Sequence, residues 1–410
     1  MVLAIMKKMT KLVGIGLAAS GLLIGFLCLE IANRTESEPH YEWPLAQEFP
    51  RPQVPNDNPM SQAKVELGRY LFYDKALSAN QTQSCSSCHI QSLAFSETKT
   101  VSVGSTGEPH RRNSPGLINI AYNKTLTWAH DGLTDIEQQI LLPIFGEDPI
   151  ELGAVGHEDE ILARLQRSPY PELFKQAFPN TEATPNFSEV TQALSSFVRS
   201  LLSLNSRFDL YAYQGQDEAL SQRELAGMDL FFSEKFECHH CHGGFNFTQS
   251  TSHEKQPLDK RPFHNTGLYY TERPSLANTS DTMTQNLGYP EKDRGLAEVT
   301  INPMDDGRFR APSLRNIALT APYMHDGSVA TLEEVLDIYQ AGGRNITEGP
   351  FQGDGRLNPL KSPFIKGFNL TSEEKLQLLA FLRSLTDEDF INNPAFSDPW
   401  PDKNLPDSDS

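Results

Sequence analysis

Two short stretches decide the fold: Cys85-Ser86-Ser87-Cys88-His89 and Cys238-His239-His240-Cys241-His242. Both have the form C-x-x-C-H, whose two thiols can bond to the two vinyl groups on one edge of a porphyrin. The histidine that follows can then bind the iron as its proximal ligand. Each stretch therefore predicts a covalently attached c-type haem. The predicted attachment residues are Cys85, Cys88, Cys238 and Cys241, and the predicted iron ligands are His89 and His242.

A zinc site and a redox dithiol are the alternatives for paired cysteines. Zinc would not require a histidine directly after both pairs, and a dithiol needs only one pair. The haem interpretation is therefore favoured at both positions. His239 and His240 fill the variable positions of the second motif, and we interpret them as solvent-facing spacers beside the haem edge rather than as a further metal site.

The sequence around the two motifs repeats. Apolar residues at helical spacing precede each cysteine pair, and similar segments follow each pair in the same order. The matching segments are residues 67–73 and 225–232, residues 112–119 and 309–316, and the His-Asp-Gly triplets at 130–132 and 325–327. This order predicts an ancient duplication. We expect a mostly α fold of two cytochrome c-like haem domains, rich in loops and with little β structure.

The chain divides into four predicted segments. Lys7 and Lys8 precede an uncharged, largely apolar run from Leu12 to Leu29. Such a run is typical of a cleaved secretory signal or of an inner-membrane anchor, and either would send the rest of the chain to the periplasm. The predicted segments are this targeting segment (1–36), a first haem domain (37–205), a second haem domain (206–390) and a tail (391–410). The boundary near 205 follows a predicted helix over 188–204.

Composition limits the partners. The 410 residues carry a net charge of −18, which argues against nucleic acid because its phosphates would be repelled. The same charge permits a basic protein partner.

Between Pro59 and Asp389 the chain resembles the bacterial di-haem cytochrome c peroxidase and MauG superfamily. Four segments are most similar to its methanobactin-associated (MbnH-type) branch: residues 104–107, 126–129, 143–147 and 321–327. The resemblance implies two haem c groups and an enzyme that reacts with hydrogen peroxide. It also implies a small periplasmic protein as substrate or electron donor.

The resemblance makes Tyr339 the sixth ligand of the second haem iron, where classical peroxidases of the family have methionine. A thioether stabilises ferrous iron, whereas an anionic phenolate favours higher oxidation states. Ser105 stands where those peroxidases have a distal histidine, and His110 is out of register with it. We therefore expect an open coordination position at the first iron.

Further roles follow from the same resemblance. Gln139 and Glu151 match the distal glutamine and glutamate that would move a proton within peroxide. Glu151 lies two residues further along than is usual, so Glu147 is its alternative. Trp128 matches a tryptophan that relays charge between the haems. Asn113, Thr320 and Pro322 match an inter-haem calcium site made of hard oxygen ligands.

These features lead to one main functional hypothesis. Hydrogen peroxide reacts at the first haem, a high-valent state is stored over both haems, and a side chain of a partner protein, a tryptophan, is oxidised. The alternative is a di-haem cytochrome c peroxidase that reduces hydrogen peroxide with electrons from a small cytochrome or cupredoxin. A plain electron carrier is the third hypothesis, and it predicts two six-coordinate haems that do not react with peroxide.

Overall fold

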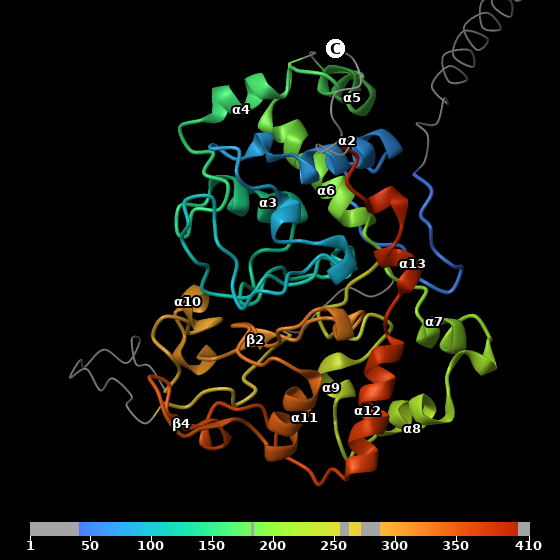
Figure 1. Cartoon of the computed structure of the whole chain (residues 1–410), viewed down its shortest axis with the longest axis vertical. Coiled ribbons are helices and arrows are strands. Elements are labelled where there is room, and N and C mark those ends of the chain that lie inside the picture. The colour runs from blue at the N-terminus through green and yellow to red at the C-terminus, as the bar shows by residue number, and fades with distance from the viewer. Residues whose placement is uncertain (1–40, 182–183, 255–261, 272–287, 401–410) are drawn as a thin grey trace, which may run out of the picture. The chain divides into compact units, whose positions relative to one another are not determined.

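Two helix pairs organise the part of the chain that the computed structural model describes, residues 41–181, 184–254, 262–271 and 288–400. In the first half, α2 (Gln62–Tyr73) packs on α6 (Phe187–Ser200). In the second half, α8 (Gln222–Phe231) packs on α12 (Ser372–Ser384), and Figure 1 shows both pairs. α2 contacts the first C-x-x-C-H motif at Cys85–Ser87, and Cys238 of the second motif packs against the apolar cluster to which α8 and α12 contribute.

Side chains that cap the helix ends fix where these helices begin. The hydroxyl of Ser61 accepts a hydrogen bond from the backbone N–H of Lys64 at 3.2 Å and so caps α2. Ser221 starts α8 with a capping box in which the Glu224 carboxylate accepts from the Ser221 N–H at 2.8 Å. Thr371 begins α12 in the same way. These contacts satisfy N–H groups that a helix start leaves free.

One glycine in each half lets the paired helices touch. A Cβ atom placed on Gly68 of α2 would lie 2.0 Å from the carbonyl oxygen of Ala193 in α6. A Cβ atom on Gly227 of α8 would lie 2.0 Å from the carbonyl oxygen of Gln377 in α12. Any larger residue would force the helices apart. The two contacts fall at corresponding points of the sequence repeat, although the duplication itself stays a prediction.

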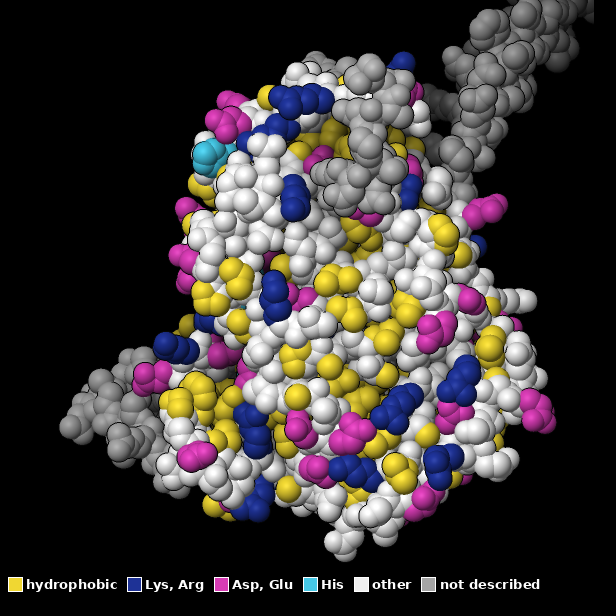
Figure 2. All heavy atoms as spheres, viewed as in Figure 1, with side chains coloured by type: hydrophobic (Ala, Val, Ile, Leu, Met, Phe, Trp, Pro, Cys, Tyr) yellow, Lys and Arg dark blue, Asp and Glu magenta, His cyan; other side chains and the backbone are white. Residues whose placement is uncertain are grey.

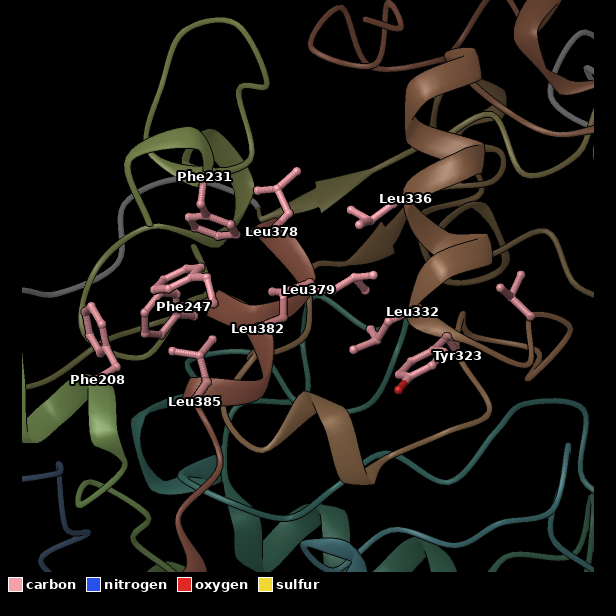
Figure 3. Packing of buried hydrophobic residues seen from close by; sticks show 12 residues of the cluster. Phe208, Phe231, Phe247, Tyr323, Leu332, Leu336, Leu378, Leu379, Leu382 and Leu385 are labelled. Carbon is pink, nitrogen blue, oxygen red and sulfur yellow. The ribbon is translucent and has the colours of Figure 1, made fainter. Parts of the chain in front are cut away.

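The core of the second half lies on two faces of α12. Figure 3 shows Leu378 and Leu382 turned towards Phe231 and Phe247, while Leu379 points towards α11 (Leu332–Ala341). Phe247 and Phe381 are fully buried here. This packing holds α11, and with it Tyr339, against the second motif.

The remaining helices are short, and the strands are few. The helices are α3 (Ile136–Phe145), α4 (Glu158–Arg164), α5 (Tyr170–Ala177), α7 (Arg207–Ala212), α9 (His239–His242), α10 (Ala297–Thr300) and α13 (Glu388–Ile391). Strand β1 (Phe263–His264) pairs antiparallel with β2 (Phe309–Arg310), and β3 (Asn345–Ile346) pairs with β4 (Gly353–Asp354). The prediction of a mostly α, loop-rich fold with little β structure is confirmed.

The C-terminal residues return to the first half. The Tyr73 hydroxyl of α2 donates to the carbonyl oxygen of Phe396 at 2.7 Å, and the Trp400 indole donates to the carbonyl oxygen of Tyr70 at 3.2 Å. The predicted targeting segment, 1–36, and residues 401–410 lie outside the described residues. Within the described ranges, no helix is long and apolar enough to cross a bilayer. The division into two haem domains at residue 205 stays a prediction.

Candidate functional site

A cavity of about 250 Å³ in the first half collects residues that are far apart in the sequence. This volume is slightly below the usual range for small-molecule sites, about 300–1,000 Å³. Both halves of the chain contribute to its wall. Its lining includes Cys85, Cys88, His89, His110, Trp128, Gln139, Glu151 and Arg310. The predicted attachment residues of the first haem thus share a cavity with the predicted distal residues.

Both motif histidines are held in the form that binds a metal. His89 Nδ1 lies 2.8 Å from the carbonyl oxygen of Phe95, to which it donates, and this leaves Nε2 with a free lone pair. His242 Nδ1 lies 3.2 Å from the carbonyl oxygen of Phe247 and 3.1 Å from that of Pro312. Burial lowers the pKa of both histidines to about 4, so each is neutral at pH 7. A neutral imidazole is the form that can bind iron.

Arg310 gives the cavity an uncompensated positive charge. Its side chain is buried, and Nε donates to the carbonyl oxygen of Thr127 at 2.9 Å. Burial lowers its pKa to about 10, and none of the described residues forms an ion pair with it. A buried cation is costly without an anion. A haem propionate is such an anion, so the charge on the wall and the donor set both fit a porphyrin in this cavity. When bound, haem supplies an iron centre that peroxide can oxidise.

Glu151 faces the same space. Its side chain is 39% exposed, and this exposure is towards the cavity that it lines. Burial among the surrounding protein atoms raises its pKa to about 7. Its Oε1 lies 3.8 Å from Nδ1 of His110, whose pKa burial lowers. Gln139 projects from α3 into the cavity. This arrangement can hold or move one proton close to neutral pH.

The backbone around Glu151 is fixed by a neighbouring loop. Ser105 N–H donates to the carbonyl oxygen of Glu151 at 2.8 Å. A Cβ atom on Gly104 would lie 1.9 Å from the carbonyl oxygen of Ile150, so only glycine allows this approach. Glu147 is exposed and is not part of the cavity wall. The geometry favours Glu151 over Glu147 as the distal acid, and the role itself stays a prediction.

Trp128 touches both halves. Its side chain is 9% exposed and lines the cavity, and its indole N–H donates to the carbonyl oxygen of Asn113 at 2.8 Å. The same side chain packs in a cluster with Phe309 of β2 and Ile338 of α11. Because Ile338 precedes Tyr339, the indole lies between the cavity and the helix that carries Tyr339.

Tyr339 reaches the second motif. Burial raises the pKa of its hydroxyl well above the usual value, and the neighbouring Cys241 and Cys238 thiols add to this effect. The side chain is half-buried, and its hydroxyl makes no hydrogen bond to any of the described residues. An unpartnered phenol beside the attachment cysteines has the position and chemistry of an axial ligand. This role stays a prediction.

The predicted calcium residues lie where two loops meet. Asn113 Nδ2 donates to the carbonyl oxygens of Lys99 and Thr100 at 3.1 and 3.2 Å, and Asn113 N–H donates to that of His325 at 2.8 Å. A Cβ atom on Gly116 would lie 3.8 Å from Cγ2 of Thr320. Pro322 belongs to the same loop as Thr320. The loops are thus adjacent, and calcium between them stays a prediction.

Two cavity residues were not assigned from the sequence. His110 was set aside because it is out of register with the family's distal histidine, yet it lines the cavity. Arg310 received no role, although it occupies the place of Asn113 in the repeated segments 112–119 and 309–316. That correspondence was the available signal, because Asn113 also lines the cavity.

Comparisons with known proteins identify the family of the chain. A family model described as di-haem cytochrome c peroxidase matches residues 62–218, and one described as RoxA-like, cytochrome c-like matches residues 308–340. The chain is 32% identical over 350 residues to cytochrome-c peroxidase IdrP1 of Denitromonas iodatirespirans, covering 81% of this chain and 84% of the relative. It is 32% identical over 350 residues to the methylamine utilization protein MauG of Methylorubrum extorquens, covering 84% and 85%.

A solved structure is more similar still. The crystal structure of a MauG-like protein associated with microbial copper homeostasis matches with a TM-score of 0.83 and 49% identity, over 88% of this chain and 100% of that one. The chain therefore belongs to the di-haem cytochrome c peroxidase and MauG family of peroxidase oxidoreductases, whose members carry two haem c groups.

Proposed function

We propose that this protein uses hydrogen peroxide to oxidise a side chain, a tryptophan, of a separate periplasmic protein. When bound, the two haems would supply the redox chemistry. In the overall reaction the partner's side chain gives up two electrons and two protons, and hydrogen peroxide is reduced to two molecules of water. The protein's own residues open the site, move the proton and carry charge between the halves.

The observation that carries this proposal is the position of the Tyr339 hydroxyl. The Tyr339 side chain is half-buried, its hydroxyl lies close enough to the Cys241 and Cys238 thiols for their charges to raise its pKa, and it has no hydrogen-bond partner among the described residues. A phenolate at this point is a hard, anionic ligand that favours oxidised iron. The second haem could then share an oxidising equivalent instead of acting mainly as an electron donor.

Residues of the cavity support a peroxide reaction in the first half. Glu151, with a pKa of about 7, can take the proton of the peroxide oxygen that approaches the iron and return it to the oxygen that leaves. Gln139 can orient the peroxide by hydrogen bonds. Trp128 lies between the cavity and α11, which is the position a charge relay requires.

The partner is proposed from the relatives and the surface. A solved structure that is 49% identical to this chain is a MauG-like protein associated with microbial copper homeostasis, so we propose a small copper-associated protein as substrate. Figure 2 shows hydrophobic, acidic and basic side chains interspersed on the viewed face. Redox partners usually meet over small, transient interfaces. The predicted targeting segment, 1–36, would export the chain, so we propose that the encounter takes place in the periplasm.

A Tyr339→Phe variant tests the proposal directly. The diferric holoprotein is mixed with one equivalent of hydrogen peroxide, and near-infrared absorption that reports charge shared between the haems is recorded. We expect the wild type to show this band and Tyr339→Phe to lose it. Tyr323→Phe is the matched control, because the Tyr323 hydroxyl of the same half only donates to the carbonyl oxygen of Ile317 at 3.0 Å. A band of unchanged intensity in Tyr339→Phe would show that the proposal is wrong.

Reduction of peroxide with electrons from a small cytochrome or cupredoxin is the second candidate. The 32% identity to a cytochrome-c peroxidase favours it as strongly as the same identity to MauG favours the first. Steady-state turnover with reduced cytochrome c that needs prior one-electron reduction of the enzyme would select this candidate. A plain electron carrier would not react with peroxide in the diferric form.

A further inference from the structure

Three potential metal ligands gather beside the second C-x-x-C-H motif. Glu234 lies in the loop before α9, while His239 and His240 are the variable residues of the motif. Glu234 Oε1 is 3.5 Å from His239 Nε2, and Glu234 Oε2 is 3.4 Å from His240 Nε2. One ligand atom from each residue lies within 4.8 Å of the others. Within the described ranges, this is the one group of three such side chains.

Neighbouring contacts orient the two imidazoles. The rings of His239 and His240 lie 4.3 Å apart with an interplanar angle of 32°. Phe364 stacks on the outer face of His240 with ring centroids 4.5 Å apart, and the Gln249 side chain donates to the carbonyl oxygen of His240. Adjacent residues of a helix normally point in different directions. Here both Nε2 atoms instead face one carboxylate.

In place of the interpretation of His239 and His240 as spacers, we propose that Glu234, His239 and His240 form a surface site for a late first-row divalent metal ion, with Cu(II) and Zn(II) as the preferred ions. Two imidazoles and a carboxylate are a donor set that suits these ions. Ligand atoms 2.0–2.1 Å from a tetrahedral ion are about 3.3 Å apart. The two carboxylate–imidazole separations, 3.4 and 3.5 Å, involve different oxygens of Glu234. One ligand atom from each residue lies within 4.8 Å of the others, so binding an ion would draw these side chains closer together. The fourth position is open to solvent because Glu234 is 79% exposed.

Because the proposed metal site lies beside the second haem, an ion bound there can be detected through the haem iron. His239 and His240 lie between the two cysteines that attach the second haem, so an ion bound there would lie beside the edge of that haem. A bound Cu(II) is paramagnetic and would therefore alter the magnetic relaxation of the neighbouring ferric iron. The site is independent of the proposed peroxide chemistry, since none of its three residues belongs to the cavity wall.

The test uses the purified di-haem protein, titrated with Cu(II) in the presence of a competing chelator and followed by electron paramagnetic resonance. We expect one copper with nitrogen hyperfine structure from two imidazoles, displaced by Zn(II). Glu234→Gln and His240→Gln should each weaken Cu(II) binding by at least about 10-fold. Faster relaxation of the second haem's ferric signal should accompany binding, and it should require higher Cu(II) concentrations in Glu234→Gln and His240→Gln than in the wild type.

A matched control is available in the first half. His157 Nδ1 lies 3.4 Å from Glu160 Oε2 in an exposed pair that has only one imidazole. Glu160→Gln should leave Cu(II) affinity unchanged. Haem content is measured in every variant. Because Glu234 lies outside the attachment motif, the Glu234→Gln variant tests the metal site even if His240→Gln attaches less haem. Wild-type affinity in Glu234→Gln, or a copper signal without nitrogen hyperfine structure, would overturn the proposal.

Discussion

Burial in the cavity changes the acid–base chemistry of single side chains. The carboxyl of Glu151 keeps its proton up to a pKa of about 7, because the surrounding protein solvates its charged form poorly. His110, 3.8 Å away, has its pKa lowered by the same cause. The pair thus contains an acid that can be neutral and a base that is uncharged at pH 7. One proton can then be held near the reacting oxygen without a net charge.

This shift predicts the pH dependence of the peroxide reaction. If Glu151 takes the proton of peroxide, only its ionised form is active, so the rate should rise about 10-fold per pH unit below about 7 and level off above it. Glu151→Gln should lower the rate at pH 8 by about 100-fold or more and flatten the profile. The measurement is stopped-flow absorption of the diferric protein with hydrogen peroxide from pH 5 to 9.

The exposed Glu147 is the control for this prediction. Glu147→Gln should keep both the wild-type rate and the rise towards pH 7, because this side chain is not part of the cavity wall. If Glu147→Gln flattens the profile and Glu151→Gln does not, the two glutamates have been assigned the wrong way round.

Residues differ in how well the sequence predicts them. Cys85 and His89 were assigned because the haem attachment motif is local and requires those residue types at that spacing. Tyr339 and Trp128 needed the family resemblance, since helical spacing predicts only a buried aromatic residue. His110 reaches the cavity from a loop and Arg310 from strand β2, and the course of both segments depends on tertiary packing. For Arg310 the correspondence with Asn113 in the repeat was the available signal, whereas no local pattern could have placed His110.

At the scale of elements, the sequence repeat predicted where the helices lie more accurately than the residues at which they begin and end. The apolar pattern over 67–73 belongs to α2, which starts five residues earlier at the Ser61 cap. The helix predicted over 188–204 ends at Ser200, where the backbone of Leu201 turns to φ −74° and ψ 73°. Apolar residues 201–204 stay buried but extend the chain towards the junction of the halves. Burial of a hydrophobic run therefore does not tell helix from extended chain.

We predict that the contact of α2 with α6 depends on Gly68 and that the contact of α8 with α12 depends on Gly227. Gly68→Ala and Gly227→Ala would each place a methyl group 2.0 Å from a backbone oxygen of the partner helix. Overpacking of this kind costs about 3 kcal/mol or more. Each variant should therefore lose roughly this much free energy of unfolding in a denaturant titration followed by circular dichroism.

Gly132→Ala is the control for the crossings. Its new Cβ atom would meet only the ring of His130 at an ordinary 3.5 Å. We expect its free energy of unfolding to stay within about 0.5 kcal/mol of the wild type. Equal losses in Gly132→Ala and Gly68→Ala would mean that general backbone effects, and not the helix contact, limit stability.

At the scale of the whole molecule, a buried polar network joins the two halves. Asn119 and Asn316 stand at corresponding places of the repeat, and both are fully buried. Ser203 N–H donates to Asn119 Oδ1 at 2.7 Å, and Asn316 Nδ2 donates to the Ser203 hydroxyl at 2.7 Å. That hydroxyl donates to Asp387 Oδ2 at 3.1 Å, and the backbone N–H of Asp387 donates to Asn316 Oδ1 at 2.8 Å. A tie of this kind keeps Trp128 in a fixed place between the halves.

The Ser203 hydroxyl is the link of this network that a single mutation can remove. Ser203→Ala leaves the Asn316 amide without its acceptor in a buried site, which costs about 1–3 kcal/mol. Ser200→Ala removes a hydroxyl that is also buried, but this one only donates to the carbonyl oxygen of Phe197 within α6 at 2.7 Å. We expect Ser200→Ala to lose less than about 1 kcal/mol.

Unfolding is followed by circular dichroism for the helices and by Soret absorption for the haem sites. If the network holds the halves together, the two probes coincide in the wild type and separate in Ser203→Ala, because each half then unfolds on its own. Coincident probes in both variants would mean that the apolar contacts around Trp128 and the returning C-terminal residues couple the halves without it.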